Sequence, residues 1–270
     1  MSDVNKGNMI DVEGDLKNNQ FSVAENFTDD AGFTWFYRYN PVNGTAVLCP
    51  EDLRIVEHDG RRLYEATKPA VKQSPRGCLR IPNFLNGHVV VGIDIFSFQG
   101  LKGGYGENEF KELYLPATVK YIGNYAFRNC KTLVKISGTL APDKIGAFAF
   151  CGCSKLRNVL IGEGTHTIDV YAFEGCTDLQ HVWFPESLRI IEDDAFAHCG
   201  NLQQIDLPDG IEEVGGTAFM RTHCRITYPE KLGFGFGAST RWRMRTNNPI
   251  KRGLFNFLNR ENIFKPSPYQ

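Results

Sequence analysis

The dipeptide Ala-Phe recurs along this chain at a constant interval of 23 residues, and two apolar series and one cysteine series keep the same interval. The series are Ala126-Phe127, Ala149-Phe150, Ala172-Phe173, Ala195-Phe196 and Ala218-Phe219; Ile122, Ile145, Ile168, Ile191 and Val214; Phe110, Leu133, Leu156, Leu179 and Leu202; and Cys130, Cys153, Cys176 and Cys199. A fixed period of this length indicates one supersecondary unit that is copied along the chain. Each copy can bury its apolar face only against its neighbours. The repeat therefore predicts a solenoid, an architecture with a long surface and no natural catalytic crevice.

One unit shows why each position is filled as it is. Val182 and Phe184 alternate with Trp183, so they share one face of a short strand while the tryptophan points to the other side. Pro185 ends that strand, because proline cannot donate a ladder hydrogen bond. The Ala-Phe pair then fills the interior between coils with a small and a large side chain. Stacked at about 4.8 Å per coil, six such units would be roughly 25–30 Å long.

The units share the pattern L-x-x-I-x-L-P-x-x-(V/L/I)-x-x-I-x-x-x-A-F-x-x-C, which resembles the BspA-like subclass of leucine-rich repeats in bacterial and protozoan surface proteins. The resemblance covers roughly residues 78–229. It implies a β-rich, right-handed leucine-rich-repeat solenoid of about six 23-residue coils with parallel strands. It also implies a non-catalytic, adhesion-type module that binds a protein partner, with a host protein, a matrix protein or a glycan as alternatives.

The repeat is imperfect at three places. An earlier unit is recognisable in Leu79-Arg80-Ile81-Pro82 and in residues 90–98, but six extra residues separate it from the next unit and are expected to loop out within 103–108. The third coil carries Ser137-Gly138-Thr139 where other coils have leucine and proline, which predicts a poorly filled strand. The fourth places Leu160 at an outward position and glycine at the proline position.

The flanks predict three regions: 1–77 as a flexible start and β-hairpin cap, 78–229 as the solenoid, and 230–270 as an irregular carboxyl-terminal cap or tail. Residues 1–30 are polar and predict a loose start. Residues 33–48 alternate apolar and polar side chains around a turn at 40–44, which predicts a hairpin. A second hairpin is expected around Asp59-Gly60. Both would cover the open edge of the first coil.

The carboxyl end is basic, since residues 221–270 contain ten Lys and Arg against two Glu. Aromatic residues are interleaved with these charges. Two interpretations stay open: a packed cap with solvated arginines, or an arm that binds nucleic acid or another anionic surface. For the second interpretation the candidate residues are Arg241, Trp242, Arg243, Arg245, Lys251 and Arg252. Nucleic acid is the less favoured partner.

Catalytic and metal-binding chemistry finds no support in the sequence, and we expect neither an enzyme nor a bound metal or cofactor. The four repeat-phase cysteines would stack into a ladder of buried thiols, with disulfides between consecutive positions as the alternative. No cysteine spacing is typical of zinc, and no histidine pair has the spacing of a helical metal site. The glycine-rich stretches lack the lysine of a phosphate-binding loop.

The remaining candidate is the outward side of the strands, which we call the strand face. Its outward positions, one per coil, are Tyr114, Ser137, Leu160, Trp183 and Asp206, with Lys111, Arg157, His181 and Gln204 beside them. Exposed aromatic and leucine side chains on a stiff sheet are typical of binding hot spots. The predicted partner-binding residues are Tyr114, Leu160, His181, Trp183 and Asp206. The alternatives are scattered exposed apolar residues without function, or side chains covered by the caps.

The compartment stays open at this point. The sequence has no run of 18 apolar residues, so no membrane span is expected, and its first residues are not typical of a signal peptide. This favours the cytoplasm or a chain that lacks its leader. The family resemblance favours the cell surface or secretion.

Overall fold

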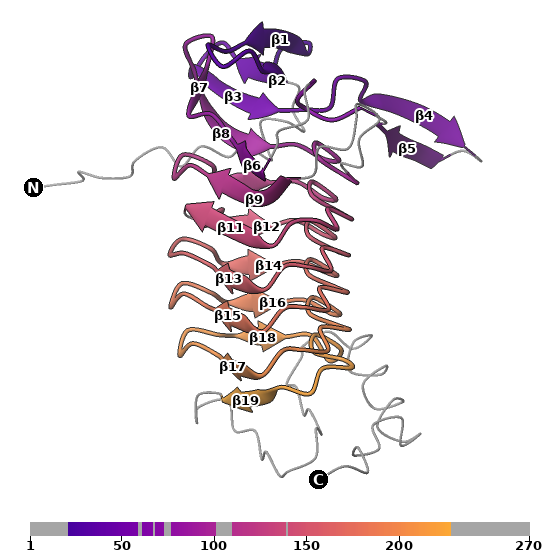
Figure 1. Ribbon diagram of the computed structural model, residues 1–270, viewed down its shortest axis with the longest axis vertical. Coiled ribbons are helices and arrows are strands. Elements are labelled where there is room, and N and C mark those ends of the chain that lie inside the picture. The colour runs from indigo at the N-terminus through magenta and orange to yellow at the C-terminus, as the bar shows by residue number, and fades with distance from the viewer. Residues whose placement is uncertain are drawn as a thin grey trace, which may run out of the picture.

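Two sheets of stacked strands run along the molecule on opposite sides of one hydrophobic core (Figure 1). The computed structural model describes residues 21–58, 61–66, 68–72, 77–100, 110–138 and 140–227. Within these ranges the regular elements are strands, as the repeat predicts. The predicted insert at 103–108 and residues 230–270 lie outside them.

The seven-stranded sheet is parallel throughout and takes one strand from each coil. Its strands are β6 (Gly77–Arg80), β9 (Phe110–Leu115), β11 (Lys135–Gly138), β13 (Asn158–Leu160), β15 (His181–Trp183), β17 (Gln204–Asp206) and β19 (Arg225–Thr227). Leu113 lies opposite Ile136 and Val159 lies opposite Val182, a shift of 23 residues each time. The sequence period is therefore the hydrogen-bonding register of the sheet.

The ten-stranded sheet lines the other side with very short parallel strands and adds antiparallel strands at its amino-terminal end. Its members are β1 (Glu25–Thr28), β2 (Thr34–Asn40), β3 (Thr45–Leu48), β7 (Phe84–Leu85), β8 (His88–Ile93), β10 (Tyr121–Ile122), β12 (Lys144–Ile145), β14 (Thr167–Ile168), β16 (Ile190–Ile191) and β18 (Glu213–Val214). The second residue of each two-residue strand from β10 to β18 is the repeat isoleucine or valine, and it is buried.

A column of six phenylalanines fills the interior. Neighbouring rings stack with centroids 5.1 to 5.3 Å apart and planes within 8° of parallel. Its members are Phe98, Phe127, Phe150, Phe173, Phe196 and Phe219. Phe98 belongs to the irregular first unit, which confirms that residues 79–98 form a coil despite the extra residues that follow it. The predicted solenoid and the plug role of Ala-Phe are both confirmed.

Backbone conformation and close packing explain the glycine at position 138 of the irregular third coil. Gly138 has a φ of 83°, and a Cβ at this position would lie 2.2 Å from the carbonyl oxygen of Leu115 in the preceding coil. A side chain larger than hydrogen is thus excluded. The same strand holds Ile136 only partly buried, as expected for a poorly filled coil.

The first hairpin forms as predicted and covers the first coil. β2 and β3 pair antiparallel around residues 41–44, and β3 then pairs in parallel with β8. The second predicted hairpin also forms, since β4 (Arg54–His58) pairs antiparallel with β5 (Arg61–Glu65) in a two-stranded sheet separate from the other two. Within the predicted loose start β1 pairs with β2, and residues 1–20 lie outside the described ranges.

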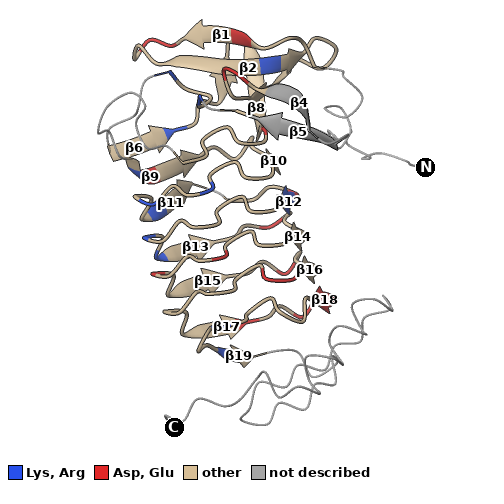
Figure 2. Cartoon of the chain, turned by 90° about the vertical axis from the view of Figure 1, so that its right-hand side faces the viewer, with Lys and Arg blue, Asp and Glu red and all other residues tan. Residues whose placement is uncertain are grey.

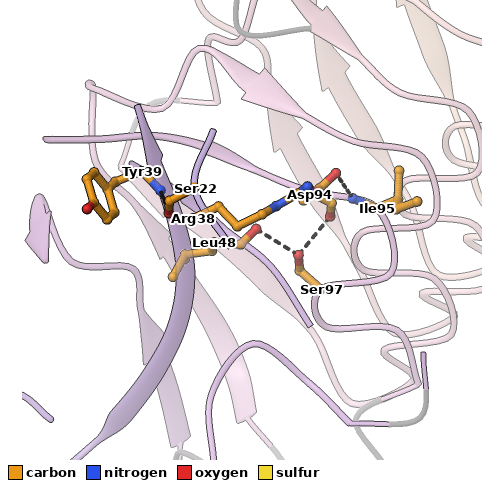
Figure 3. Close-up of polar contacts among 7 residues, drawn as sticks. All are labelled: Ser22, Arg38, Tyr39, Leu48, Asp94, Ile95 and Ser97. Atoms are coloured by element: carbon orange, nitrogen blue, oxygen red, sulfur yellow. Dashed lines mark hydrogen bonds and ion pairs between the residues drawn. The ribbon is translucent and has the colours of Figure 1, made fainter. Parts of the chain in front are cut away.

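A buried polar cluster joins this hairpin to the first coil (Figure 3). Arg38 of β2 forms an ion pair with Asp94, whose side chain is 6% exposed. The other carboxylate oxygen of Asp94 accepts a 2.8 Å hydrogen bond from the Ile95 amide. Ser97 Oγ lies 3.1 Å from the carbonyl oxygen of Leu48 in β3. The cap is therefore held by specific polar contacts as well as by sheet pairing.

Candidate functional site

The strand face is built by the simplest rule of sheet geometry. Each strand of the solenoid points its middle residue into the core and its two neighbours outward. Because the strands are parallel and shifted by one repeat, the outward residues align in two columns across the sheet. One column contains Glu112, Lys135, Asn158, His181, Gln204 and Arg225, and the other contains Arg80, Tyr114, Ser137, Leu160, Trp183, Asp206 and Thr227.

The middle of the face is apolar and open. Leu160 and Trp183 are direct register partners on β13 and β15, and their side chains are 63% and 52% exposed. The ring of His181 lies 5.7 Å from that of Trp183, tilted by 31°. Other large exposed apolar residues in the described ranges, such as Val42 and Phe84, do not lie on the strands of this face. The structure therefore brings together three of the five predicted binding residues.

Tyr114 lies at the amino-terminal end of the same column and is half-buried. The guanidinium of Arg80 in the neighbouring strand sits 5.0 Å from the centre of its ring. Beside it, Ser137 donates a 2.5 Å hydrogen bond to Glu112, which lowers the pKa of that carboxyl group. Lys135 approaches the same carboxylate at 3.8 Å. Polar contacts within the face thus occupy this end.

Asp206 lies one coil beyond Trp183 and is exposed. Both of its carboxylate oxygens accept hydrogen bonds from the side-chain amide of Gln204, at 2.9 and 3.0 Å. The partner comes from the same strand, so the pair forms a polar border to the apolar centre. A border of this kind excludes water from an anchor residue without contributing much binding energy of its own.

Lys and Arg gather beside β11 and β13 on this side of the molecule (Figure 2). Exposed basic residues precede or begin these two strands, among them Lys131, Lys155 and Arg157. Exposed acidic residues follow the strand ends at one repeat position, namely Glu163, Glu186 and Asp209. The carboxylate of Glu163 also accepts the amide of Glu186 in the next coil at 3.0 Å. In the fourth coil Leu160 therefore lies between a basic and an acidic edge, whereas Asp178 takes the place of Lys155 in the coil of Trp183.

A second column of aromatic residues was not predicted. Phe96, Tyr125, Phe148 and Tyr171 immediately precede the buried pair in successive coils and stack with centroids 4.6 to 5.0 Å apart. All four adopt φ between 58° and 61°, a left-handed conformation unusual for bulky residues. Arg128 lies over two of the rings. The signal was present in the sequence, because Tyr125, Phe148 and Tyr171 share one repeat position.

The cysteine ladder is buried. All eight cysteines are free, and consecutive ladder positions are not joined by disulfides. The four ladder thiols each donate to the carbonyl oxygen of a core phenylalanine at 3.2 to 3.3 Å. Burial raises the pKa of Cys153 and Cys176 well above the ordinary value and that of Cys199 to about 12. Such thiols are poor nucleophiles and poor metal ligands.

The described residues contain no group of three or more His, Cys, Asp or Glu side chains arranged to hold a metal ion. They also contain no helix with the length and apolar character needed to cross a bilayer. The basic candidates Arg241, Trp242, Arg243, Arg245, Lys251 and Arg252 lie outside the described residues, so their role as an anion-binding arm stays a prediction.

The fold is shared with solved bacterial leucine-rich repeat proteins. A leucine-rich repeat protein from Eubacterium ventriosum is 20% identical over 86% of this chain and 54% of its own, with a TM-score of 0.51. The pneumococcal vaccine antigen PcpA is 16% identical over 77% of this chain and 51% of its own, with a TM-score of 0.54. This chain thus spans about half the length of either protein. No curated protein matches the sequence.

The repeats themselves match a known repeat family. Residues 104–225 match the BspA type leucine rich repeat region in six copies. These are the coils whose phenylalanines, isoleucines and cysteines line the core. Over these residues the solenoid of this chain matches a BspA type leucine rich repeat region, and the chain is similar there to leucine-rich repeat proteins of that type.

Proposed function

We propose that this chain is a non-catalytic interaction module that binds a protein partner through its strand face. The observation that carries the proposal is the exposure of Leu160 and Trp183, which are register partners on adjacent parallel strands. Both side chains are more than half exposed, although the hydrophobic effect favours burying them. A partner that covers them gains this energy without ordering a loop, because the two strands belong to a rigid sheet.

The repeat family supports the same class of function. Solenoids present extended, repeated surfaces that suit recognition of other macromolecules. The border of polar residues around Leu160 and Trp183 matches the arrangement of interface hot spots, in which near-neutral contacts surround a few apolar anchors. From the resemblance to this repeat family we also propose that the chain lies at a cell surface and acts in adhesion.

Cross-linking mass spectrometry tests where a partner binds. The full chain is used to capture proteins from host lysate and from matrix preparations, and lysine-reactive cross-links are mapped. We expect cross-links at Lys131, Lys135 and Lys155 beside the strand face rather than at Lys120 and Lys144 beside the ten-stranded sheet. Cross-links confined to Lys120 and Lys144 would overturn the proposal.

Two variants sharpen this test. Trp183→Ser removes the central anchor and should reduce capture at least tenfold, as for other aromatic hot-spot residues. Phe84→Ser is the matched control, since Phe84 is a similarly exposed aromatic residue (60%) outside the strand face. Equal capture by the two variants would contradict the proposal. Loss of binding only when Arg241, Arg243 and Arg245 are replaced by alanine would favour the basic arm instead.

A further inference from the structure

The carboxyl-terminal end of the solenoid is formed by the last strand of each sheet. Among the described strands, none lies beyond β18 in the ten-stranded sheet or beyond β19 in the seven-stranded sheet. At the opposite end β1, β2 and β3 extend the ten-stranded sheet and cover the first coil (Figure 1). A sheet edge that stays open is a template for aggregation, and solenoids require a capping element at each end. The carboxyl-terminal end therefore requires a covering segment of its own.

Apolar side chains of the last coil lie at this end. Phe219, the last ring of the core column, stacks on Phe196 at 5.3 Å. Cys224 and Ile226 pack against the same core and are only partly buried. Removing water from such groups is favourable, so a covering segment that brings apolar side chains is stabilised here.

Acidic residues are concentrated in the same part of the solenoid. Residues 186–213 contain eight Asp and Glu against one basic residue, Arg189, which gives a net charge of −7. Residues 110–155 contain seven Lys and Arg against two acidic residues, a net charge of +5. Figure 2 shows acidic residues beside β16 and β18 and basic residues beside β11. A cationic segment is therefore attracted to the last coils and repelled by the first ones.

The chain itself supplies a segment with both properties. Residues 228–270 follow directly on Thr227, the last residue of β19, so they are tethered at this end. They contain eight Lys and Arg against two Glu, a net charge of +6, and eight aromatic residues. The tether gives the segment an effective concentration on the order of millimolar, so weak contacts are sufficient for docking.

From this complementarity we infer that residues 228–270 bind the carboxyl-terminal end of the solenoid as an intramolecular cap. Their aromatic side chains cover the last coil, and their Lys and Arg side chains pair with the acidic residues of 186–213. The inference concerns a different surface from the strand face and does not rest on the proposed function. It assigns the basic residues to the chain itself, so an external anion must displace the cap before it can bind them.

Zero-length carbodiimide cross-linking of the full chain tests the contact, because it joins a lysine amine only to a carboxylate that touches it. Lys251 and Lys265 are the diagnostic residues, since they lie far along the segment from its tether. We expect intramolecular links from these two lysines to acidic residues of 186–213. Links only to carboxylates outside that range, or no link to the solenoid, would show that the segment does not bind there.

Two neutralising substitutions test the charges. Asp209 and Glu212 are exposed, so Asp209→Asn with Glu212→Gln removes two charges from the acidic end and keeps the size of the side chains. Trypsin cleavage within residues 241–245 of the full chain at low salt should become about fivefold faster, because the segment is released more often. Glu25→Gln with Asp30→Asn removes the same charge from exposed positions near the amino-terminal end and is the matched control. Equal cleavage rates in the two double variants would contradict the inference.

Binding of a short DNA duplex at low salt separates this cap from a free basic arm. The variant with Asp209→Asn and Glu212→Gln should bind the duplex about threefold more tightly than the matched control, because the two have the same net charge but only the first releases the basic segment. Equal binding by the two variants would mean that the acidic end does not hold the segment, and the inference would be wrong.

Discussion

The thiol of Cys176 donates a 3.3 Å hydrogen bond to the carbonyl oxygen of Phe150, which lies in the preceding coil. That oxygen also accepts the amide of Cys153 at 3.1 Å. Both interactions repeat along the ladder, so each cysteine ties its own turn to the coil before it. The repeat position needs a small apolar side chain that can donate once, and cysteine meets both needs in a space where serine would bury a more polar group.

The ladder predicts that stability falls in alkaline solution. Burial raises the pKa of Cys199 from the ordinary value of 9.0 to about 12. Below pH 9 both the folded and the unfolded chain keep this proton, so stability is fully present. As the pH rises from about 9 toward about 12, the unfolded chain loses the proton and the folded chain keeps it. The free energy of unfolding should then fall by about 1.4 kcal/mol per pH unit for this thiol.

Urea unfolding at a series of pH values above 9 measures this effect. Other groups also titrate in this range, so Cys199→Ala is the reference. The variant is expected to be less stable at neutral pH and to lose stability less steeply above pH 9. Equal slopes for the variant and the parent protein would show that Cys199 ionises in the folded state without cost.

The left-handed aromatic column predicts an unusual order of two substitutions. Phe148 stacks between Tyr125 and Tyr171 at 4.8 and 4.6 Å, and its φ is 58°. Replacement by alanine or by glycine removes the same ring contacts. Glycine accepts this conformation freely, whereas alanine keeps a strain of about 1–2 kcal/mol. Phe148→Gly should therefore be the more stable variant by about 1 kcal/mol.

Phe150, two residues away, provides the control for this comparison. It is buried and is not among the residues with positive φ. Here glycine should be less stable than alanine, the usual order, because glycine has the greater conformational entropy in the unfolded chain. Thermal unfolding of the four variants gives both differences. The same order at both positions would mean that the left-handed strain at Phe148 is negligible.

The core column predicts a gradient of cost along the solenoid. Phe173 is stacked at 5.2 Å on both sides, by Phe150 and Phe196, and is fully buried. Phe173→Ala should cost about 3–5 kcal/mol of unfolding free energy, as other large truncations in cores do. Phe219 stacks on Phe196 at 5.3 Å and is 5% exposed rather than fully buried, so Phe219→Ala should cost less. Denaturant titration measures both, and a loss below about 1 kcal/mol at Phe173 would contradict the stacking.

The sequence predicted the parts of this fold that repeat. The interval of 23 residues determines which residues pair across the sheets, and the alternation around Trp183 places it outward, as the structure confirms. Contacts between residues that occupy different positions of the repeat, or that lie outside it, could not be predicted from the period. Arg38 and Asp94 are 56 residues apart and follow no period, so no pattern could pair them. The stack of Arg80 on Tyr114 depends on rotamers, which a strand pattern does not specify.

The second hairpin shows a different limit. Its two strands pair as predicted. The position of a hairpin on the rest of the fold depends on long-range packing, which the local alternation of its strands does not specify. The same holds for the aromatic column, since sequence periodicity shows that Tyr125, Phe148 and Tyr171 are aligned but not that their backbone is left-handed.

The last prediction concerns the join between the cap and the first coil. Asp94 is 4% exposed, and its carboxylate pairs with Arg38, whose side chain is 27% exposed. Arg38→Met removes the cation and leaves a buried carboxylate with one amide donor, which should cost about 3 kcal/mol. Adding Asp94→Asn to this variant removes the uncompensated charge and should recover part of the loss. Equilibrium unfolding of both single variants and the double variant gives the coupling energy of the pair. If the losses of the two single variants simply add, the ion pair does not hold the hairpin against the solenoid, and pairing between β3 and β8 alone must do so.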